Sequence, residues 1–165
     1  MEQKDLILDH KQIQHKITRI AYQVYETYVD ESEVIIAGVN GNGYTFASKI
    51  VDQLKAISNL DVKLCKVNID KKNPLNSVST DLPAEEYTNK AIVIADDVLN
   101  TGSTLIYAVH HFLNVPLKKI KTTVLVNRNH KNFPIKADFK GISLSTSSHN
   151  TIKVEFNEND AAYLI

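Results

Sequence analysis

The sequence predicts an α/β fold with a central, mostly parallel sheet flanked by helices. Short β-branched apolar runs, typical of strands that are buried on both faces, occur at 34–39, 91–95 and 120–126. Segments with apolar residues at three- and four-residue spacing, typical of amphipathic helices, alternate with these runs at 9–29, 44–57 and 105–112. This alternation is the pattern of a parallel α/β domain. A chain of 165 residues can form one well-packed core, so we expect a single domain over 1–165.

The first half of the chain is predicted to form two helices and two strands. A helix over 9–29 has Asp9 as its N-cap and an apolar stripe that consists of Ile13, Ile17, Ile20, Val24 and Tyr28. A buried strand over 34–39 leads through the turn Gly41-Asn42-Gly43 into the helix over 44–57. The alternation of apolar and polar residues from Val62 to Ile69 predicts the next strand.

Residues 70–89 are predicted to form a long loop. They include Pro74 and Pro83, many Asn, Ser and Asp residues, and few large apolar residues. A loop of this length in a compact domain often has a function, such as covering an active site. We therefore expect a flap here, in which Lys71 and Lys72 are either contacts for an anionic ligand or solvated surface lysines.

The second half continues the alternation. A strand over 91–95 precedes a helix over 105–112, and a further β-branched strand covers 120–126. Short candidate strands follow near 134–138, 141–145 and 151–156. In open α/β sheets, ligands bind beyond the carboxyl ends of the strands, so the segments that follow these strands are the first place to look for a site.

Composition and charge exclude several classes of protein. Lys and Arg (19 residues) balance Asp and Glu (19 residues), so global charge does not indicate binding to nucleic acid or membranes. Cys65 is the only cysteine, which excludes an intrachain disulfide and a cysteine-based zinc site and indicates a small core residue. The N-terminal segment lacks the apolar core of a signal peptide, and no apolar run approaches the ~20 residues of a membrane span. We expect a cytoplasmic protein without a membrane partner.

Residues 91–104 carry the most specific pattern in the chain. The apolar strand ends in Asp96 and Asp97, two apolar residues follow, and the turn Asn100-Thr101-Gly102-Ser103-Thr104 opens a helix. Adjacent carboxylates suit ligand hydroxyls or waters on a magnesium ion. Backbone N–H groups and hydroxyls at the start of a helix suit a phosphate, although the turn is not a Walker A loop. The pattern predicts a site for a phosphorylated sugar; the simpler alternative is a strand end followed by a Ser or Thr N-cap.

This stretch resembles the phosphoribosyl pyrophosphate (PRPP) motif of type I phosphoribosyltransferases. The resemblance implies the type I phosphoribosyltransferase fold, with a flexible flap and a small hood. It implies that Asp96 and Asp97 hold the ribose 2′ and 3′ hydroxyls and contact Mg²⁺ indirectly, through those hydroxyls or water. It also implies that Thr101–Thr104 bind the 5′-phosphate. The whole implied ribose 5-phosphate site consists of Asp96, Asp97, Val98, Leu99, Asn100, Thr101, Gly102, Ser103 and Thr104.

Three other segments resemble one branch of these enzymes. They are Ile7-Leu8-Asp9, Ile17–Ala21, and Val124–Gly141 with Ser145–Ser147. The branch is the PyrR-like family of bifunctional pyrimidine operon regulators and uracil phosphoribosyltransferases. Its reaction joins a nucleobase, with uracil favoured, to PRPP and releases pyrophosphate. The resemblance implies Asp96, Asp97 and Arg128 as catalytic residues, Mg²⁺ as cofactor, PRPP and a nucleobase or nucleoside monophosphate as ligands, and a homo-oligomer such as a dimer.

The implied pyrophosphate loop departs from the family's pattern. The family has a loop similar to Gly-Ile-Lys-Thr-Arg-Gly, whereas this chain has Gly38 followed by Val39, Asn40, Gly41, Asn42 and Gly43. Lys and Arg form strong charge-assisted hydrogen bonds with phosphates, and both are missing here. The loop is left with backbone N–H groups, Asn amides and magnesium, so we expect weaker PRPP binding or a changed substrate. A catalytically weak nucleotide-sensing regulator of pyrimidine metabolism is the alternative.

Two further features concern the base and RNA. Purine phosphoribosyltransferases have an Asp at the position of Asn100, and an amide cannot accept a ring proton near neutral pH, which disfavours a purine. In the resembling family, operon-leader RNA is bound by a region that corresponds here to Arg19, Arg128, His130, Lys131 and Lys136. Because RNA affinity needs several cationic phosphate contacts and the net charge is zero, RNA binding and ordinary surface charge remain open alternatives.

Overall fold

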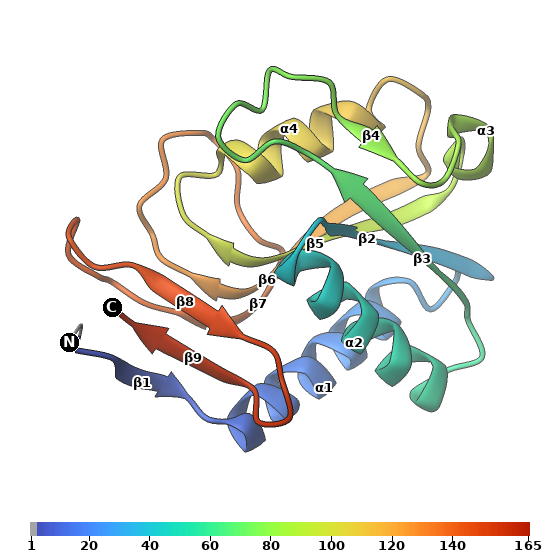
Figure 1. Cartoon of the computed structure of the whole chain (residues 1–165). Coiled ribbons are helices and arrows are strands. Elements are labelled where there is room, and N and C mark those ends of the chain that lie inside the picture. The colour runs from blue at the N-terminus through green and yellow to red at the C-terminus, as the bar shows by residue number, and fades with distance from the viewer. Residues whose placement is uncertain (1–2) are drawn as a thin grey trace.

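The structure is a computed structural model that describes residues 3–165 (Figure 1). Within these residues the helices are α1 (His10–Thr27), α2 (Asn42–Ile57), α3 (Ala84–Tyr87) and α4 (Ser103–Phe112). The strands are β1 (Asp5–Leu8), β2 (Glu33–Val39), β3 (Asp61–Asn68), β4 (Ser79–Thr80), β5 (Ala91–Leu99), β6 (Lys119–Asn127), β7 (Phe139–Ser143), β8 (Ile152–Glu155) and β9 (Ala161–Leu164). The main sheet has the strand order β4-β3-β2-β5-β6-β7, and a second sheet has the order β1-β9-β8. No helix in 3–165 combines the length and apolar character needed to cross a membrane.

The main sheet confirms the predicted, mostly parallel architecture. Its strands β2, β3, β5, β6 and β7 run parallel, and the short edge strand β4 is antiparallel to β3. Ile36 and Val93 belong to the core that includes α1 and α2. Their neighbours Ile35 and Ile92 belong to the core on the other face, which includes α4. Because the central strands are buried on both faces, their sequences are continuous apolar runs.

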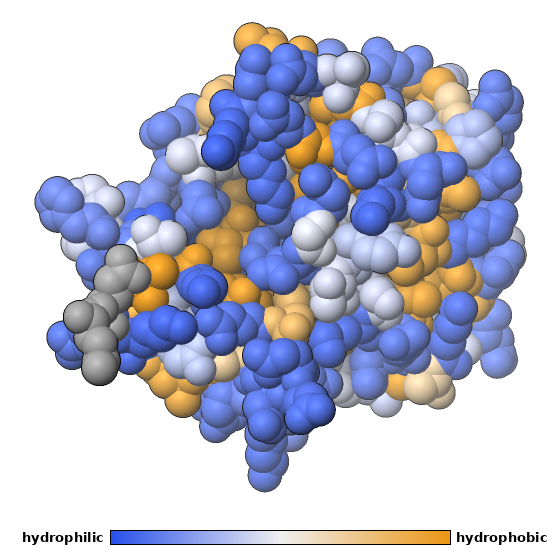
Figure 2. All heavy atoms as spheres, in the orientation of Figure 1, coloured by the Kyte–Doolittle hydropathy of each residue, from blue (hydrophilic) through white to orange (hydrophobic). Residues whose placement is uncertain are grey.

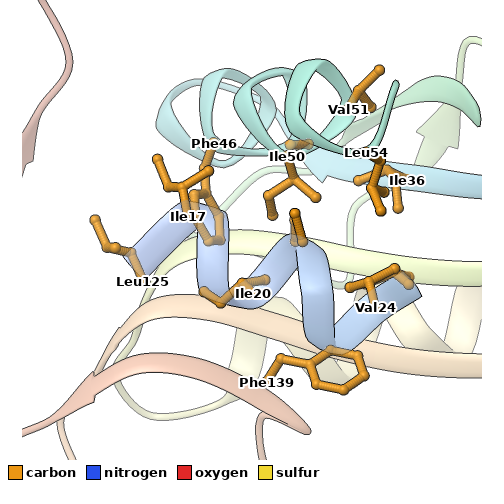
Figure 3. Packing of buried hydrophobic residues seen from close by; sticks show 14 of the residues in the cluster. Ile17, Ile20, Val24, Ile36, Phe46, Ile50, Val51, Leu54, Leu125 and Phe139 are labelled. Carbon is orange, nitrogen blue, oxygen red and sulfur yellow. The ribbon is translucent and has the colours of Figure 1, made fainter. Parts of the chain in front are cut away.

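Helices α1 and α2 lie side by side on one face of the main sheet (Figures 1 and 3). Ile17 and Val24 of α1 pack in the same core as Phe46 of α2. The predicted N-cap of α1 is confirmed: Gln12 N donates to Asp9 Oδ1 at 2.8 Å, and Asp9 N donates to Gln12 Oε1 at 2.9 Å. This reciprocal capping box satisfies backbone donors that the helix itself leaves unpaired, so it fixes where α1 begins.

The strands near the two ends of the described chain are only partly predicted by the sequence. β8 lies within the predicted strand 151–156 and β7 overlaps 141–145, but the prediction for 134–138 is wrong, because these residues form a loop. The sequence does not predict β1 and β9, which have four residues each and acquire hydrogen-bonding partners only from one another and from β8. Asp5 pairs with Leu164, so the two ends of the described chain lie side by side (Figure 1). The second sheet, β1-β9-β8, is the small hood.

The predicted loop over 70–89 is partly ordered into regular structure. β4 pairs with β3, and the Asp81 carboxylate accepts a hydrogen bond from Lys66 N at 2.8 Å. α3 ends in Tyr87, a buried ring that packs edge-on against Phe112 at 4.9 Å between ring centroids. The expectation of a continuous long loop is therefore wrong for 79–87. The buried ring of Tyr87 and two residue pairs between β4 and β3 anchor this part to the fold.

Cys65 is a buried core residue of β3, as predicted. Burial raises the pKa of its thiol to about 12, because the low-dielectric core disfavours the thiolate. We expect the folded protein to be unreactive towards Ellman's reagent at pH 8, and the unfolded protein in guanidinium chloride to release one equivalent of chromophore. A folded protein that reacts as fast as the unfolded one would contradict this placement.

Candidate functional site

A pocket of about 210 Å³ lies where β5 leads into α4. All nine residues of the predicted ribose 5-phosphate site, from Asp96 to Thr104, line it. The remaining lining residues are Leu105 of α4, Lys71 after β3, Val124 of β6 and Ile152 of β8. Because Ile152 belongs to β8, the hood forms one wall of the pocket, and Figure 2 shows the molecule hollowed beside the hood. The pocket thus occupies the place where open α/β sheets bind their ligands.

The two adjacent carboxylates lie inside β5 rather than after it. The strand continues to Leu99, with Asp96 paired opposite Val124 of β6, so the predicted strand end at residue 95 is too early. Asp96 is buried, and its Oδ1 accepts from Asp97 N at 2.9 Å and from Lys71 Nζ at 3.4 Å. Asp97 is half-buried and accepts from Asn42 Nδ2 at 3.4 Å. The carboxylates therefore have separate partners.

The pKa of Asp96 rises to about 8 in the folded protein. Burial is the largest cause, the neighbouring Asp97 carboxylate adds repulsion, and Lys71 opposes both by attraction. Asp97 is the more exposed carboxylate of the two, so it is the better placed to accept hydrogen bonds from ligand hydroxyls. Asp96 is instead a buried acid that needs either a proton or a nearby cation.

The turn before α4 lines the pocket with Asn100–Thr104, and Ser103 N donates to Thr101 Oγ1 at 3.3 Å. Gly102, the N-cap residue, has a φ of +88°, a left-handed conformation that favours glycine. Asn132 N and Phe133 N donate to Thr101 O at 2.8 and 3.1 Å, so the loop after β6 holds the turn from behind. The first N–H groups of a helix have no intrahelical acceptor, and the helix dipole favours an anion there. The start of α4 can therefore bind a phosphate.

The predicted pyrophosphate loop, Val39–Gly43, lies beside this pocket but does not line it. The role of this loop as a pyrophosphate site stays a prediction, and the structure shows one amide atom of each Asn bonded within the protein. Asn40 Oδ1 accepts from Ile69 N at 3.2 Å. Asn42 Nδ2 donates to Val154 O of the hood at 2.8 Å. Both amides thus connect the loop to other parts of the fold.

Arg128 lies at the rim of the site. Its guanidinium donates to Asn100 Oδ1 at 3.2 Å, to Thr146 Oγ1 at 3.0 Å and to Ser147 O at 3.2 Å. These bonds join the phosphate turn to the segment before β8, and Arg128 itself is not among the pocket-lining residues. A catalytic role for Arg128 stays a prediction, since the contacts seen here are those of a residue that positions Asn100.

Of the four lining residues outside the motif Asp96–Thr104, Lys71 and Ile152 come from the segment after β3 and from the hood. Lys71 lies just after β3. The sequence contains one indication of this role, since residues that follow a strand of a parallel sheet often reach its ligand site. Ile152 carries no such signal, because it belongs to a sheet that the sequence predicts poorly. The basic residues considered for RNA binding are partly occupied: Arg19 Nη2 donates to the carbonyl oxygens of Lys140 and Gly141 at 3.0 and 2.8 Å.

The pocket fits a magnesium ion that is shared with a substrate. Mg²⁺ prefers oxygen ligands, and it usually keeps several waters while binding one or two carboxylates and substrate phosphates. Residues 3–165 contain no cluster of three or more His, Cys, Asp or Glu side chains that could hold a metal. Asp97, half-buried and facing a polar pocket, offers one suitable carboxylate. Any ion here would depend on substrate and water for its remaining ligands.

Comparisons with known proteins agree with this geometry. Residues 3–160 match the family model described as phosphoribosyl transferase domain. The bifunctional protein PyrR of Bacillus pumilus is 33% identical, with 100% of this chain and 97% of the relative covered. That of Clostridium beijerinckii is 32% identical, with coverages of 97% and 94%.

Solved structures with the same fold are also found. A hypoxanthine-guanine phosphoribosyltransferase from Bacillus anthracis superposes with a TM-score of 0.74 at 20% identity, covering 88% of this chain and 85% of that one. The hypoxanthine phosphoribosyltransferase of Trypanosoma cruzi gives a TM-score of 0.75 at 16% identity, with coverages of 90% and 84%. At these identities the likeness establishes the fold, and it confirms the predicted α/β architecture.

Proposed function

The chain belongs to the phosphoribosyl transferase family of pentosyltransferases, and from this premise we propose that it forms a nucleoside monophosphate and pyrophosphate from PRPP and a nucleobase, with uracil favoured. The observation that carries the proposal is the pocket between β5 and α4, which the complete motif Asp96–Thr104 lines. A half-buried carboxylate and a helix start lie together there, which matches the hydroxyls and the phosphate of a ribose 5-phosphate. We assign this activity to one domain over 1–165.

In the proposed reaction the protein mainly orients its substrates. Asp97 accepts hydrogen bonds from the ribose hydroxyls, and the N–H groups at the start of α4 hold the 5′-phosphate. A ring nitrogen of the base then forms a bond to the anomeric carbon, the bond from that carbon to pyrophosphate breaks, and the ring N–H proton passes to solvent. Mg²⁺ supplies charge neutralisation on the leaving pyrophosphate. Holding the reacting atoms in line accounts for most of the rate enhancement expected from such a site.

The choice of uracil depends on Asn100 and on the relatives. Asn100 Oδ1 accepts from Arg128 Nη1 at 3.2 Å, so its carbonyl oxygen is already paired with a cation. An amide in this state does not act as a proton acceptor for a purine ring. The relatives named bifunctional protein PyrR match this chain over nearly its full length. The PyrR-like family that the chain resembles favours uracil, and this supports a pyrimidine.

The test is product formation from PRPP and Mg²⁺ with uracil, hypoxanthine or guanine offered separately. We expect UMP from uracil and little product from the purines. Asp97→Asn removes a charge-assisted acceptor worth about 1.5–3 kcal/mol, so the Kd of PRPP should rise roughly 10- to 100-fold. Asp52→Asn, the same change at an exposed position of α2, is the control and should behave as wild type. Unchanged PRPP affinity in Asp97→Asn would show that the ribose site is elsewhere, and IMP or GMP formation would overturn the choice of base.

A second function, nucleotide sensing with little catalysis, is favoured by the loop Val39–Gly43. The loop has no cationic side chain, and its two Asn amides are used for contacts within the protein. Isothermal titration calorimetry and a turnover assay separate the two functions. Tight binding of UMP or PRPP without product supports the sensor, whereas product formation at a rate typical of enzymes supports the transferase.

A further inference from the structure

We propose that Lys71 provides the cationic contact for the pyrophosphate group of PRPP, an inference that rests on the function proposed above. PRPP brings a strongly anionic pyrophosphate to a pocket that already contains two carboxylates. Within the part of the chain that the structure describes, Lys71 is the one cationic residue among those lining the pocket. A ligand with this charge therefore needs Lys71 in addition to backbone N–H groups and magnesium.

The ammonium group of Lys71 lies close to Asp96, and its partly exposed side chain has room to change rotamer. Its Nζ lies 3.4 Å from Asp96 Oδ1, and its side chain is 44% exposed. Asp96 is buried, so an ionised Asp96 needs the lysine when no ligand is bound. A pyrophosphate that carries several negative charges and accepts several hydrogen bonds competes well for the same ammonium group. Lys71 can thus exchange one anionic partner for another without leaving the pocket.

The position of Lys71 favours a contact with the pyrophosphate over a contact with the 5′-phosphate. Asn40 N donates to Val67 O at 2.8 Å, and Ile69 N donates to Asn40 Oδ1 at 3.2 Å, so the chain leading to Lys71 is bonded to the loop Val39–Gly43. On the pocket side, a Cβ placed on Gly43 would lie only 2.7 Å from Asp96 Oδ1. The lysine, the loop and the carboxylate are therefore neighbours, so Lys71 lies beside the predicted pyrophosphate loop.

The turn that carries Lys71 is held by its own hydrogen bonds. Asp70 Oδ1 accepts from Lys72 N at 3.0 Å and from Asn73 N at 3.3 Å, and Asp70 Oδ2 accepts from Asn76 Nδ2 at 3.0 Å. These bonds favour the ionised carboxylate and lower the pKa of Asp70. A turn fixed in this way presents Lys71 from a defined backbone, which reduces the entropy lost when the lysine binds a ligand.

Lys72 provides a matched control. It is adjacent in sequence, has the same side chain and charge, and is exposed on the same turn, but it does not line the pocket. An effect that arises only from the net charge of the turn would appear equally in Lys71→Met and Lys72→Met. A direct contact would appear in Lys71→Met alone.

The test measures the Kd of PRPP, of inorganic pyrophosphate and of UMP, each with Mg²⁺, by calorimetry on the full chain. For Lys71→Met we expect the Kd of PRPP and of pyrophosphate to rise roughly tenfold or more, as for the loss of one charge-assisted hydrogen bond. The Kd of UMP, which has no pyrophosphate, should change less than about threefold. Lys72→Met should match wild type, and Lys71→Arg should recover part of the lost affinity.

The possible outcomes separate this proposal from the proposed function. Wild-type protein that binds neither PRPP nor UMP would overturn both. Wild-type protein that binds PRPP, with Lys71→Met binding it equally well, would overturn the role of Lys71 and leave the proposed function intact. Equal losses for UMP and PRPP in Lys71→Met would place the lysine on the 5′-phosphate side and would also contradict the assignment to pyrophosphate.

Discussion

Asp96→Asn is expected to make the protein more stable and a poorer enzyme. The pKa of Asp96 is about 8 in the folded chain, well above its ordinary value of 3.8, mainly because the carboxyl is buried. Between these two pH values the folded protein keeps a proton that the unfolded protein releases. Wild-type stability therefore decreases as pH rises through this window, and it is least affected below the ordinary pKa.

Asparagine cannot ionise, so the variant should keep its stability across the same window. Its Oδ1 can still accept from Asp97 N, the bond that Asp96 makes at 2.9 Å. The lost ion pair with Lys71 matters little for folding, because the lysine side chain is 44% exposed and water screens its charge. We expect a gain on the order of a few kcal/mol at pH 8, or about 2–4 °C in Tm per kcal/mol for a domain of this size, and little gain at pH 4.

The measurement is thermal unfolding of wild type and Asp96→Asn at several pH values from 4 to 8.5. Asp52→Asn, an exposed carboxylate on α2, controls for the loss of one charge and should leave the pH dependence unchanged. UMP formation by Asp96→Asn should fall, as is common when a destabilising active-site group is removed. A variant that is less stable than wild type at pH 8 would contradict the buried, proton-holding state of Asp96.

Gly102→Ala is expected to damage both stability and phosphate binding. The φ of +88° is costly for alanine, and a Cβ on Gly102 would lie 2.5 Å from Ile135 Cγ2, closer than carbon atoms can pack. Left-handed strain of about 1–2 kcal/mol and overpacking of about 1–3 kcal/mol together predict a loss of roughly 2–5 kcal/mol in unfolding free energy. The turn would also move, and a shift of about 1 Å at a site that positions a substrate can cost ~10²-fold in rate.

A double-mutant comparison separates the two causes. Ile135→Ala removes the atom that the new methyl group would strike, so Gly102→Ala/Ile135→Ala should recover the packing part of the loss and keep the backbone strain. Urea unfolding gives the stabilities, and calorimetry with ribose 5-phosphate gives the affinity of the turn. Wild-type affinity and stability in Gly102→Ala alone would contradict the conformation described for this turn.

The fold class was predictable because its signals are local. Continuous apolar runs indicate strands buried on both faces, and this is how β2, β5 and β6 are placed. The capping box at Asp9 similarly marks the start of α1. β1 and β9 were not predictable, since strands of four residues have too little sequence to show a period and form only when the two ends of the chain meet.

The candidate site also has one part that local sequence predicts and another that depends on tertiary structure. By itself the sequence determined the motif Asp96–Thr104, because a strand, a turn and a helix start that are contiguous in the chain carry their geometry with them. Only the tertiary structure decided that Lys71 joins the pocket, that Asn42 is bonded to Val154, and that Asp96 is buried. Each of these depends on residues 25 or more positions apart or on the packing around them. A polar side chain has a limited number of hydrogen bonds to make, and only the folded arrangement decides whether the protein or a ligand receives them.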